Sequence, residues 1–243
     1  MKIVFLGSSH GVPEPNRKCS STLVEAGGSK YIVDMGTGAV EDLITRGIAA
    51  REIRAVFITH MHGDHTNGLV SFLDLCSWKF KDADPALFLP GDTERTRAAL
   101  CEWLACNDTV MRPFDLHRVE EGVIYDDGGL RVTAYGTKHN RASFAYLLEA
   151  EGKRVLFSGD LSTKGPAVDF PLSVLNAPLD LAVCECAHFE ATEYLPLFEG
   201  KKNLRRLCFN HYSEVRLASL LEMPRLLPEL PMLRATDGLE ITL

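Results

Sequence analysis

The residues of this chain best suited to chemistry lie in one short stretch, Thr59-His60-Met61-His62-Gly63-Asp64-His65. Three imidazoles and a carboxylate fall within six residues, directly after the apolar run at residues 55–58. Neutral imidazole and carboxylate groups are ligands for a borderline divalent metal such as zinc. A strand that ends in a tight loop can aim alternate side chains into one cavity, and Gly63 allows the backbone to turn there. The stretch therefore predicts a metal site, since a surface loop with coincidental histidines would not gather three of the chain's eight in one hexapeptide.

The segments on either side of this stretch would hold it in place. Residues 54–58 predict the strand that delivers it. Residues 66–80 predict a helix, because five apolar side chains recur at near-helical spacing. This helix would put Asp64 and His65 at the mouth of its N-terminus. The apolar residues are Leu69, Phe72, Leu73, Leu75 and Cys76.

A His-x-His-x-Asp-His motif after a hydrophobic strand resembles the metal-binding motif of the metallo-β-lactamase superfamily. The resemblance makes a demand on the rest of the chain: a later histidine, then an aspartate after a strand, then a final histidine. His139, Asp160 and His211 occur in that order, each after a predicted strand. The resemblance therefore covers nearly the whole chain.

The resemblance also implies which residues share a metal. His60, His62 and His139 would hold the first ion, and Asp64, His65 and His211 the second. Asp160 would bridge both. Two divalent ions roughly 3.5–4 Å apart can share a hydroxide and clamp an electrophile, so the resemblance implies a hydrolase with a metal-bridging hydroxide. Asp64 could also accept a hydrogen bond from the attacking water. Zinc is the expected metal, and manganese or iron could replace it.

The predicted strands fall into two batches, each containing or followed by helices. This pattern suits two sheets packed face to face with helices outside, as a single domain over residues 1–243. The resemblance names the α/β (α+β) architecture: a four-layer αβ/βα metallo-β-lactamase sandwich of two mixed sheets, with the site at one edge between them. The predicted strands are residues 2–6, 21–25, 30–34, 54–58, 86–89, 119–126, 130–135, 143–150, 153–158, 181–186, 204–209 and 239–243. The predicted helices are residues 39–45, 66–80, 93–106 and 214–221; in the third of these, Cys101, Trp103 and Cys106 are expected in the core.

Two further residues are candidates for roles beside the metals. In the superfamily an aspartate at the position of Asp34 supports a ligand by hydrogen bonding, and a turn or helix-capping carboxylate is the alternative. His188 follows the strand at residues 181–186, at the sheet end where the ligands gather. We hypothesise that His188 protonates the leaving group or grips a substrate oxygen. The alternative is a buried histidine satisfied by the backbone.

Four residues near the predicted ligands are candidates for contacting substrate. His10 lies in the glycine-rich loop after the first strand, and a solvated loop histidine is the alternative for it. Arg141 follows His139 by two positions and could neutralise a phosphate. Tyr212 and Ser213 directly follow His211.

Composition limits the partners and the compartment. The 243 residues carry a formal charge of −7 with a pI near 5.6, so no overall basic field indicates a nucleic-acid partner. The seven cysteines show no disulfide framework, and no leader or membrane-spanning run is evident. These features favour a cytoplasmic protein with reduced thiols and no membrane partner. A homodimer remains open.

The substrate is inferred from a narrower resemblance. Residues 139–147 and 157–160 look most like the ribonuclease Z branch and its phosphodiesterase relatives. Two departures weigh against tRNA: the long glycine- and proline-bearing arm of that branch is absent, and so is its His-Ser-Thr stretch. The acidic pI agrees. The sequence therefore predicts a phosphodiesterase for a small anionic phosphodiester or nucleotide. The alternatives are a carboxylic ester, lactone or thioester hydrolase, a tRNA 3′-processing nuclease, and a non-enzymatic metabolite-binding module.

Overall fold

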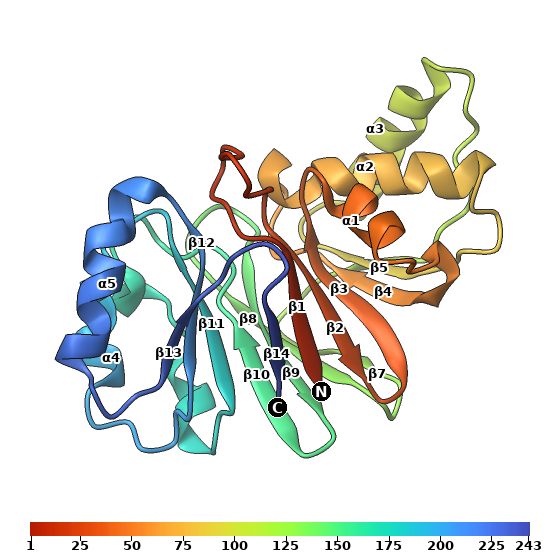
Figure 1. Cartoon of the computed structure of the whole chain (residues 1–243). Coiled ribbons are helices and arrows are strands. Elements are labelled where there is room, and N and C mark those ends of the chain that lie inside the picture. Colours follow the sequence, from red (N-terminus) through yellow and green to blue (C-terminus); the bar gives the residue numbers. More distant parts are fainter.

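The computed structural model describes all 243 residues. The chain forms two seven-stranded mixed sheets that pack face to face, with helices on both outer sides (Figure 1). The first sheet has the order β14-β1-β2-β3-β4-β5-β6 and the second β13-β12-β11-β10-β9-β8-β7. The strands of the first sheet are β1 (Lys2–Gly7), β2 (Ser21–Ala26), β3 (Ser29–Met35), β4 (Ile53–Phe57), β5 (Ala86–Leu89), β6 (Leu116–Arg118) and β14 (Glu240–Thr242). Those of the second are β7 (Gly122–Asp126), β8 (Arg131–Gly136), β9 (Phe144–Ala150), β10 (Lys153–Phe157), β11 (Leu181–Cys186), β12 (Leu207–Tyr212) and β13 (Met232–Arg234).

Strand direction determines where the site can form. Strands β3 to β6 are mutually parallel, as are β10 to β13. The carboxyl ends of parallel strands meet at one edge of a sheet, and ligands of open α/β sheets bind at that edge. The predicted metal-ligand motifs follow β4, β8 and β10 or lie at the end of β12. The fold therefore gathers these segments along one end of the sandwich.

Three apolar layers hold the sandwich together. The central layer lies between the sheets and includes Phe57, Tyr146 and Phe157. A second layer packs the first sheet against the helices α1 (Ala39–Thr45), α2 (Gly63–Trp78) and α3 (Thr93–Ala105). A third packs the second sheet against α4 (Leu195–Phe198) and α5 (Leu217–Leu226). The predicted four-layer architecture is therefore confirmed.

Packing rather than helix propensity holds α2 in place. Its first turn contains Gly63 and it has a second glycine at Gly68, each of which costs about 1 kcal/mol relative to alanine. Leu69, Phe72 and Leu73 are buried against the first sheet, and burying such a side chain contributes about 1.5–3 kcal/mol. The free energy gained by burying these three side chains exceeds the cost of the two glycines.

The structure departs from the predictions at several elements. Helix α2 begins at Gly63, so Asp64 and His65 belong to its first turn. Strand β12 lies three residues later than predicted, which puts His211 inside the strand. The short elements β6, β13 and α4 were missed, because runs of three or four residues carry no periodicity.

The prediction that Cys101, Trp103 and Cys106 lie in the core is wrong. Both thiols are exposed, and the Trp103 side chain is 68% exposed. Leu100 and Leu104 are the buried residues of helix α3, which projects from the body at the upper right of Figure 1. None of the helices combines the length and the apolar character needed to cross a membrane.

Candidate metal centre

Seven imidazole and carboxylate side chains from both sheets converge at the strand-end edge of the sandwich. They form two groups on either side of Asp160, a buried residue in the loop after β10. His60, His62 and His139 make up the first group. Asp64, His65 and His211 make up the second.

In the first group three ring nitrogens face one another. His62 Nδ1 lies 3.0 Å from His60 Nε2 and 3.1 Å from His139 Nε2. Asp160 Oδ2 lies 3.6 Å from both of those Nε2 atoms. His60 and His62 come from the loop after β4, and His139 comes from the loop after β8. The group therefore spans the two sheets.

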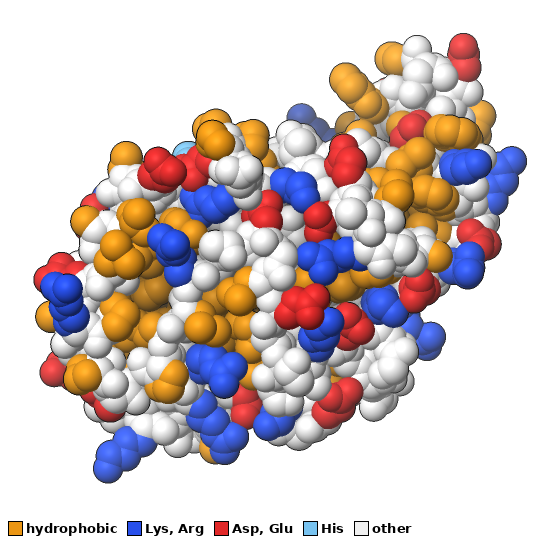
Figure 2. All heavy atoms as spheres, viewed as in Figure 1, with side chains coloured by type: hydrophobic (Ala, Val, Ile, Leu, Met, Phe, Trp, Pro, Cys, Tyr) orange, Lys and Arg blue, Asp and Glu red, His pale blue; other side chains and the backbone are white.

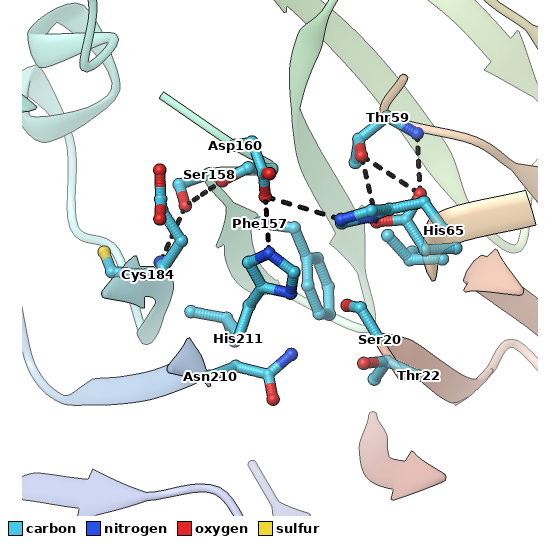
Figure 3. A pocket seen from close by; sticks show the side chains of 15 residues that line it. Ser20, Thr22, Thr59, His65, Phe157, Ser158, Asp160, Cys184, Asn210 and His211 are labelled. Atoms are coloured by element: carbon cyan, nitrogen blue, oxygen red, sulfur yellow. Dashed lines mark hydrogen bonds and ion pairs between the residues drawn. The ribbon is translucent and has the colours of Figure 1, made fainter. Parts of the chain in front are cut away.

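The second group is built around the other oxygen of Asp160. Asp160 Oδ1 lies 3.5 Å from His65 Nε2 and 3.3 Å from His211 Nε2, two contacts that Figure 3 marks. Asp64 Oδ2 lies 3.3 Å from His65 Nε2 and 3.7 Å from His211 Nε2. One carboxylate therefore directs one oxygen at each group.

This arrangement fits two divalent ions. Four ligand atoms at zinc–nitrogen distances of 2.0–2.1 Å would lie about 3.3 Å apart around a tetrahedral ion, close to the separations in both groups. His65 Nε2 and Asp160 Oδ1 are also buried and form no hydrogen bond within the protein. Buried polar atoms normally have partners, so these atoms are placed to serve as ligands.

Burial and neighbouring charge set the protonation of these groups. Burial lowers the pKa of His60 to about 2, and the charge of His65 acts in the same direction, so the imidazole is neutral. Burial would raise the pKa of Asp160, but the charges of His211 and His65 hold it well below its ordinary value. A neutral imidazole and an ionised carboxylate are the forms that bind metal.

Asp34 orients histidines of both groups. Its Oδ2 accepts a hydrogen bond of 2.8 Å from His65 Nδ1, which leaves Nε2 directed at the second group. The Thr59 hydroxyl donates to Asp34 and lies 3.2 Å from His60 Nδ1, so Asp34 also supports the first group through Thr59. Asp34 is buried at the end of β3. Asp34 thus lies within hydrogen-bond distance of one predicted ligand and of Thr59, and its supporting role stays a prediction.

Two of these residues have left-handed backbones. Asp34 has φ 56° and His211 has φ 50°, a region that non-glycine residues seldom adopt. At His211 the pairing of β12 with β11 shifts register, because Asn210 pairs with Glu185 and Tyr212 with Cys186. Such a bulge re-aims a side chain next to a site. His211 is thereby directed toward Asp160, and its Nδ1 donates to Ser9 O.

The first turn of α2 lies directly against the end of β3. A Cβ atom at Gly36 would lie 2.2 Å from Asp64 O, and one at Gly68 would lie 2.2 Å from Gly36 O. Only glycine permits this approach. The close contact fixes Asp64 and His65 relative to Asp34.

His188 borders the first group and is held by Glu185, a carboxylate that no sequence motif indicates. Its Nδ1 donates to Glu185, at 3.0 and 2.9 Å from the two oxygens, while Nε2 lies 3.9 Å from Asp160 Oδ2. Burial would lower the pKa of His188, but the hydrogen bond and charge of Glu185 raise it above its ordinary value. Glu185 also accepts from the backbone of Leu161 and Ala187. The available signal was one charged residue inside the apolar strand β11.

The candidates for contacting substrate lie in different surroundings. The Tyr212 hydroxyl donates to Ala235 O, its ring is buried, and Arg17 covers that ring at 3.9 Å, so a substrate contact of Tyr212 stays a prediction. His10 Nε2 lies 3.2 Å from Glu14 Oε1 and is partly exposed. Arg141 is exposed and Ser213 is partly exposed. His10, Arg141 and Ser213 remain predictions.

The role of Asp34 can be tested with Asp34→Asn, which tolerates the left-handed backbone but lacks the carboxylate charge. With zinc as the probe metal, we expect the affinity of the weaker of the two sites to fall about 10–100-fold, because partners of ligating histidines contribute that much. Competition with a chromophoric chelator measures it. The control is Asp74→Asn on α2, where an aspartate bonds Trp78 away from the centre. Equal zinc affinity in both variants would contradict the role.

The comparisons with known proteins agree with this geometry. The family model described as "Anti-Pycsar protein Apyc1" matches residues 1–176. The ribonuclease Z of Pseudomonas putida (strain KT2440) is 35% identical over 199 residues, covering 72% of this chain and 60% of that protein. The ribonuclease Z of Mycobacterium sp. (strain KMS) is 28% identical over 237 residues, covering 91% and 80%. For Thermosynechococcus vestitus ribonuclease Z, 34% identical over 159 residues, the match covers 63% of this chain and only 38% of the relative.

Solved structures share the fold over the full chain. The Bacillus subtilis metallo-β-lactamase fold protein YhfI superposes with a TM-score of 0.79 at 16% identity, covering 99% of each chain. Human tRNase Z, short form, superposes with a TM-score of 0.75 at 19% identity, covering 100% of this chain and 99% of that one. From the family match, the fold and the ordered ligand set, the chain belongs to the metallo-β-lactamase superfamily, in its ribonuclease Z and phosphodiesterase-like branch and in the family described as Anti-Pycsar protein Apyc1.

Proposed function

We propose that this protein is a metal-dependent phosphodiesterase with two divalent ions, zinc above all, that acts on a small anionic phosphodiester or nucleotide. The observation that carries the proposal is the Asp160 carboxylate, whose two oxygens face two separate ligand groups. Relatives named ribonuclease Z support a phosphodiester as the bond that is cleaved. The seven free cysteines support a reducing, cytoplasmic setting.

The ions, when bound, supply a deprotonated water near neutral pH and stabilise charge that develops on phosphoryl oxygens. The protein positions them through the two ligand groups and Asp34. We assign Asp64 a second role as acceptor of a hydrogen bond from the attacking water. Its side chain is 12% exposed, so the carboxylate borders the open side of the centre.

His188 is assigned as the proton donor to the leaving oxygen. Glu185 occupies Nδ1, so the proton available for transfer is on Nε2, which points to the same side as Asp160. Cleavage of the P–O ester bond leaves an alkoxide, and transfer of the Nε2 proton converts it to an alcohol. The side chain is 24% exposed, so water can restore the proton afterwards.

Surface charge supports a small substrate over a long nucleic acid. Figure 2 shows Lys and Arg side chains interspersed with Asp and Glu over the visible face, without an extended basic area. The net charge is −7. Tight binding to a phosphate backbone depends on many cationic contacts, which this face does not collect.

A substrate screen tests the proposal. Zinc-loaded protein is assayed with bis-p-nitrophenyl phosphate, p-nitrophenyl acetate, a homoserine lactone and a precursor tRNA. We expect kcat/KM for the phosphodiester to exceed that for the carbon esters by at least about 100-fold, a difference of roughly 2.7 kcal/mol in transition-state binding. Turnover of the ester or lactone alone would contradict the assignment as a phosphodiesterase. Faster cleavage of the tRNA than of the small phosphodiester would contradict the proposal of a small substrate. Ligand binding without turnover would indicate a binding module.

A further inference from the structure

The loop between β1 and β2, residues 8–20, lies against the second ligand group. The carbonyl oxygen of Ser9 lies 3.1 Å from His211 Nδ1, and because a carbonyl can only accept, His211 carries its proton on Nδ1. Nε2 is thereby left as the ring atom that faces Asp64 and the rest of the group. A Cβ atom at Gly11 would lie 3.7 Å from Asp64 Oδ2, so the loop borders a second ligand as well.

Both ends of this loop are held by one carboxylate, that of Asp237 in the turn between β13 and β14. Asp237 Oδ1 accepts from the backbone N–H and the hydroxyl of Ser8, at 3.0 and 2.8 Å. Asp237 Oδ2 accepts from the backbone N–H of Lys18 at 2.7 Å. Figure 1 shows the loop in red at the upper end of β1, with the dark blue turn beside it. The carboxylate therefore closes the loop at its base.

The main chain around Asp237 fixes the position of this carboxylate. Gly238 N–H donates to Phe5 O at 2.7 Å, and Phe5 N–H donates to Leu239 O at 3.0 Å, so the turn is joined to β1 by two hydrogen bonds. Gly238 has φ 85°, a left-handed backbone that glycine adopts readily. Asp237 is thus a fixed anchor for the loop.

Ser9 connects this anchor to the metal ligand. It directly follows Ser8, which is fully buried, and its backbone N–H donates to Lys18 O at 2.8 Å. Ser9 also forms a β-bridge with Tyr212, the residue after the ligand in β12. The two residues that Asp237 binds are therefore the ones that hold the Ser9 carbonyl in place.

We propose that Asp237 is a positioning residue for the second metal site and acts on His211 through the Ser9 carbonyl. The inference rests on the two metal ions of the proposed function and not on the identity of the substrate. Three donors converge on the Asp237 carboxylate, which accepts at both oxygens. An asparagine has one accepting oxygen, and its NH₂ group would face one of these donors. Asp237→Asn therefore keeps the size of the side chain but opens one end of the loop.

The geometry restricts the effect to one of the two metal sites. His211 belongs to the second group, and Ser9 O is the hydrogen-bond partner of its Nδ1. The histidines of the first group lie in the loops after β4 and β8, whereas Asp237 binds the loop after β1. Loosening that loop should therefore weaken the second site and leave the first unchanged.

Metal affinity measures this effect. With zinc as the probe metal, competition with a chromophoric chelator follows the two equivalents in turn. In Asp237→Asn we expect one equivalent to bind about 5–10-fold more weakly and the other to be unchanged. Direct partners of ligating histidines contribute roughly 10–100-fold, and Asp237 acts one contact further out. Hydrogen exchange in the zinc-loaded protein should also become faster across residues 8–20.

Ser8→Ala provides a milder second variant. It removes one of the three donors and leaves the Asp237 carboxylate in place. Because one hydrogen bond is lost while the loop stays closed, we expect the same zinc equivalent to weaken by about two- to threefold. An unchanged affinity for both equivalents in Ser8→Ala and Asp237→Asn would overturn the proposal.

The matched control is Asp180→Asn. Asp180 is a buried aspartate that likewise joins two segments, because it accepts from Arg154 N–H at 3.0 Å and from the Arg205 side chain at 2.8 Å. It precedes β11, at the end of the sheet away from the ligands. We expect this variant to lower Tm and to leave both zinc equivalents unchanged.

Three outcomes would contradict the positioning role. They are an equal loss of both equivalents in Asp237→Asn, the same loss in Asp180→Asn, and faster exchange across residues 8–20 with unchanged zinc affinity. A wild-type protein that binds fewer than two ions would contradict the proposed function itself, and this inference with it. Two ions in the wild type with no selective loss in Asp237→Asn would overturn this inference alone.

Discussion

Replacing Asp160 with Asn is expected to remove at least one of the two metal ions and to lower kcat/KM for a phosphodiester by roughly 1,000-fold or more. The physical reason is the division of the carboxylate between the two groups. Oδ2 lies 3.6 Å from two histidines of the first group, and Oδ1 lies 3.3 Å from His211 in the second. An amide of the same shape has one oxygen and no charge, so it can serve one group at most.

Metal content by mass spectrometry and steady-state kinetics measure this outcome together. The matched control is Asp115→Asn, an exposed carboxylate beside His117 that should keep two ions and full turnover. If Asp160→Asn retained two ions per chain, the bridging role would have to be abandoned. Retention of activity with one ion would instead limit the reaction to a single group.

Removal of the His188 imidazole is expected to have an effect that depends on the leaving group. With an alkyl phosphodiester, His188→Ala should lower kcat about 10²–10⁴-fold, because general acid catalysis contributes that much when the leaving oxygen is strongly basic. With bis-p-nitrophenyl phosphate the loss should be less than about tenfold, since p-nitrophenolate departs without a proton. Zinc content should stay at two, because His188 Nε2 is 3.9 Å from the nearest ligand oxygen.

The leaving-group comparison distinguishes proton donation from a structural role. A merely structural histidine would reduce turnover of both substrates by the same factor. His117→Ala is the control, since that exposed histidine bonds Asp115 outside the centre. Equal losses for the two substrates in His188→Ala would disprove the assignment as proton donor.

The part of the site that sequence could predict was the part with fixed spacing and chemical type. Imidazoles and aspartates after apolar strands are recognisable because strand ends on one sheet edge must lie together. Glu185 was not recognised, since its function depends on a partner three residues later across a turn.

Fold prediction succeeded and failed for similar reasons. Strands with strong apolar runs, such as β5 and β11, have the predicted bounds. Strand β12 was placed three residues early, because the bulge at His211 hides the polar end of the strand from a period-two pattern. Trp103 was expected in the core on the basis of residue type. Helix α3 projects from the body of the protein, and the type of a residue alone does not show whether its helix packs against a sheet.

Because the ligands come from both sheets, the stability of the folded protein depends on whether its metal ions are bound. Each group takes side chains from both halves of the sandwich: His60 and His62 meet His139, and Asp64 and His65 meet His211. An ion in either group would therefore cross-link the two sheets, which otherwise contact each other through apolar side chains. Ligands that bind only the native state stabilise it by about 2.7 kcal/mol at a hundredfold excess over Kd. Scarcity of the bound metal would thus lower the molecule's resistance to heat and proteolysis as well as stop its reaction.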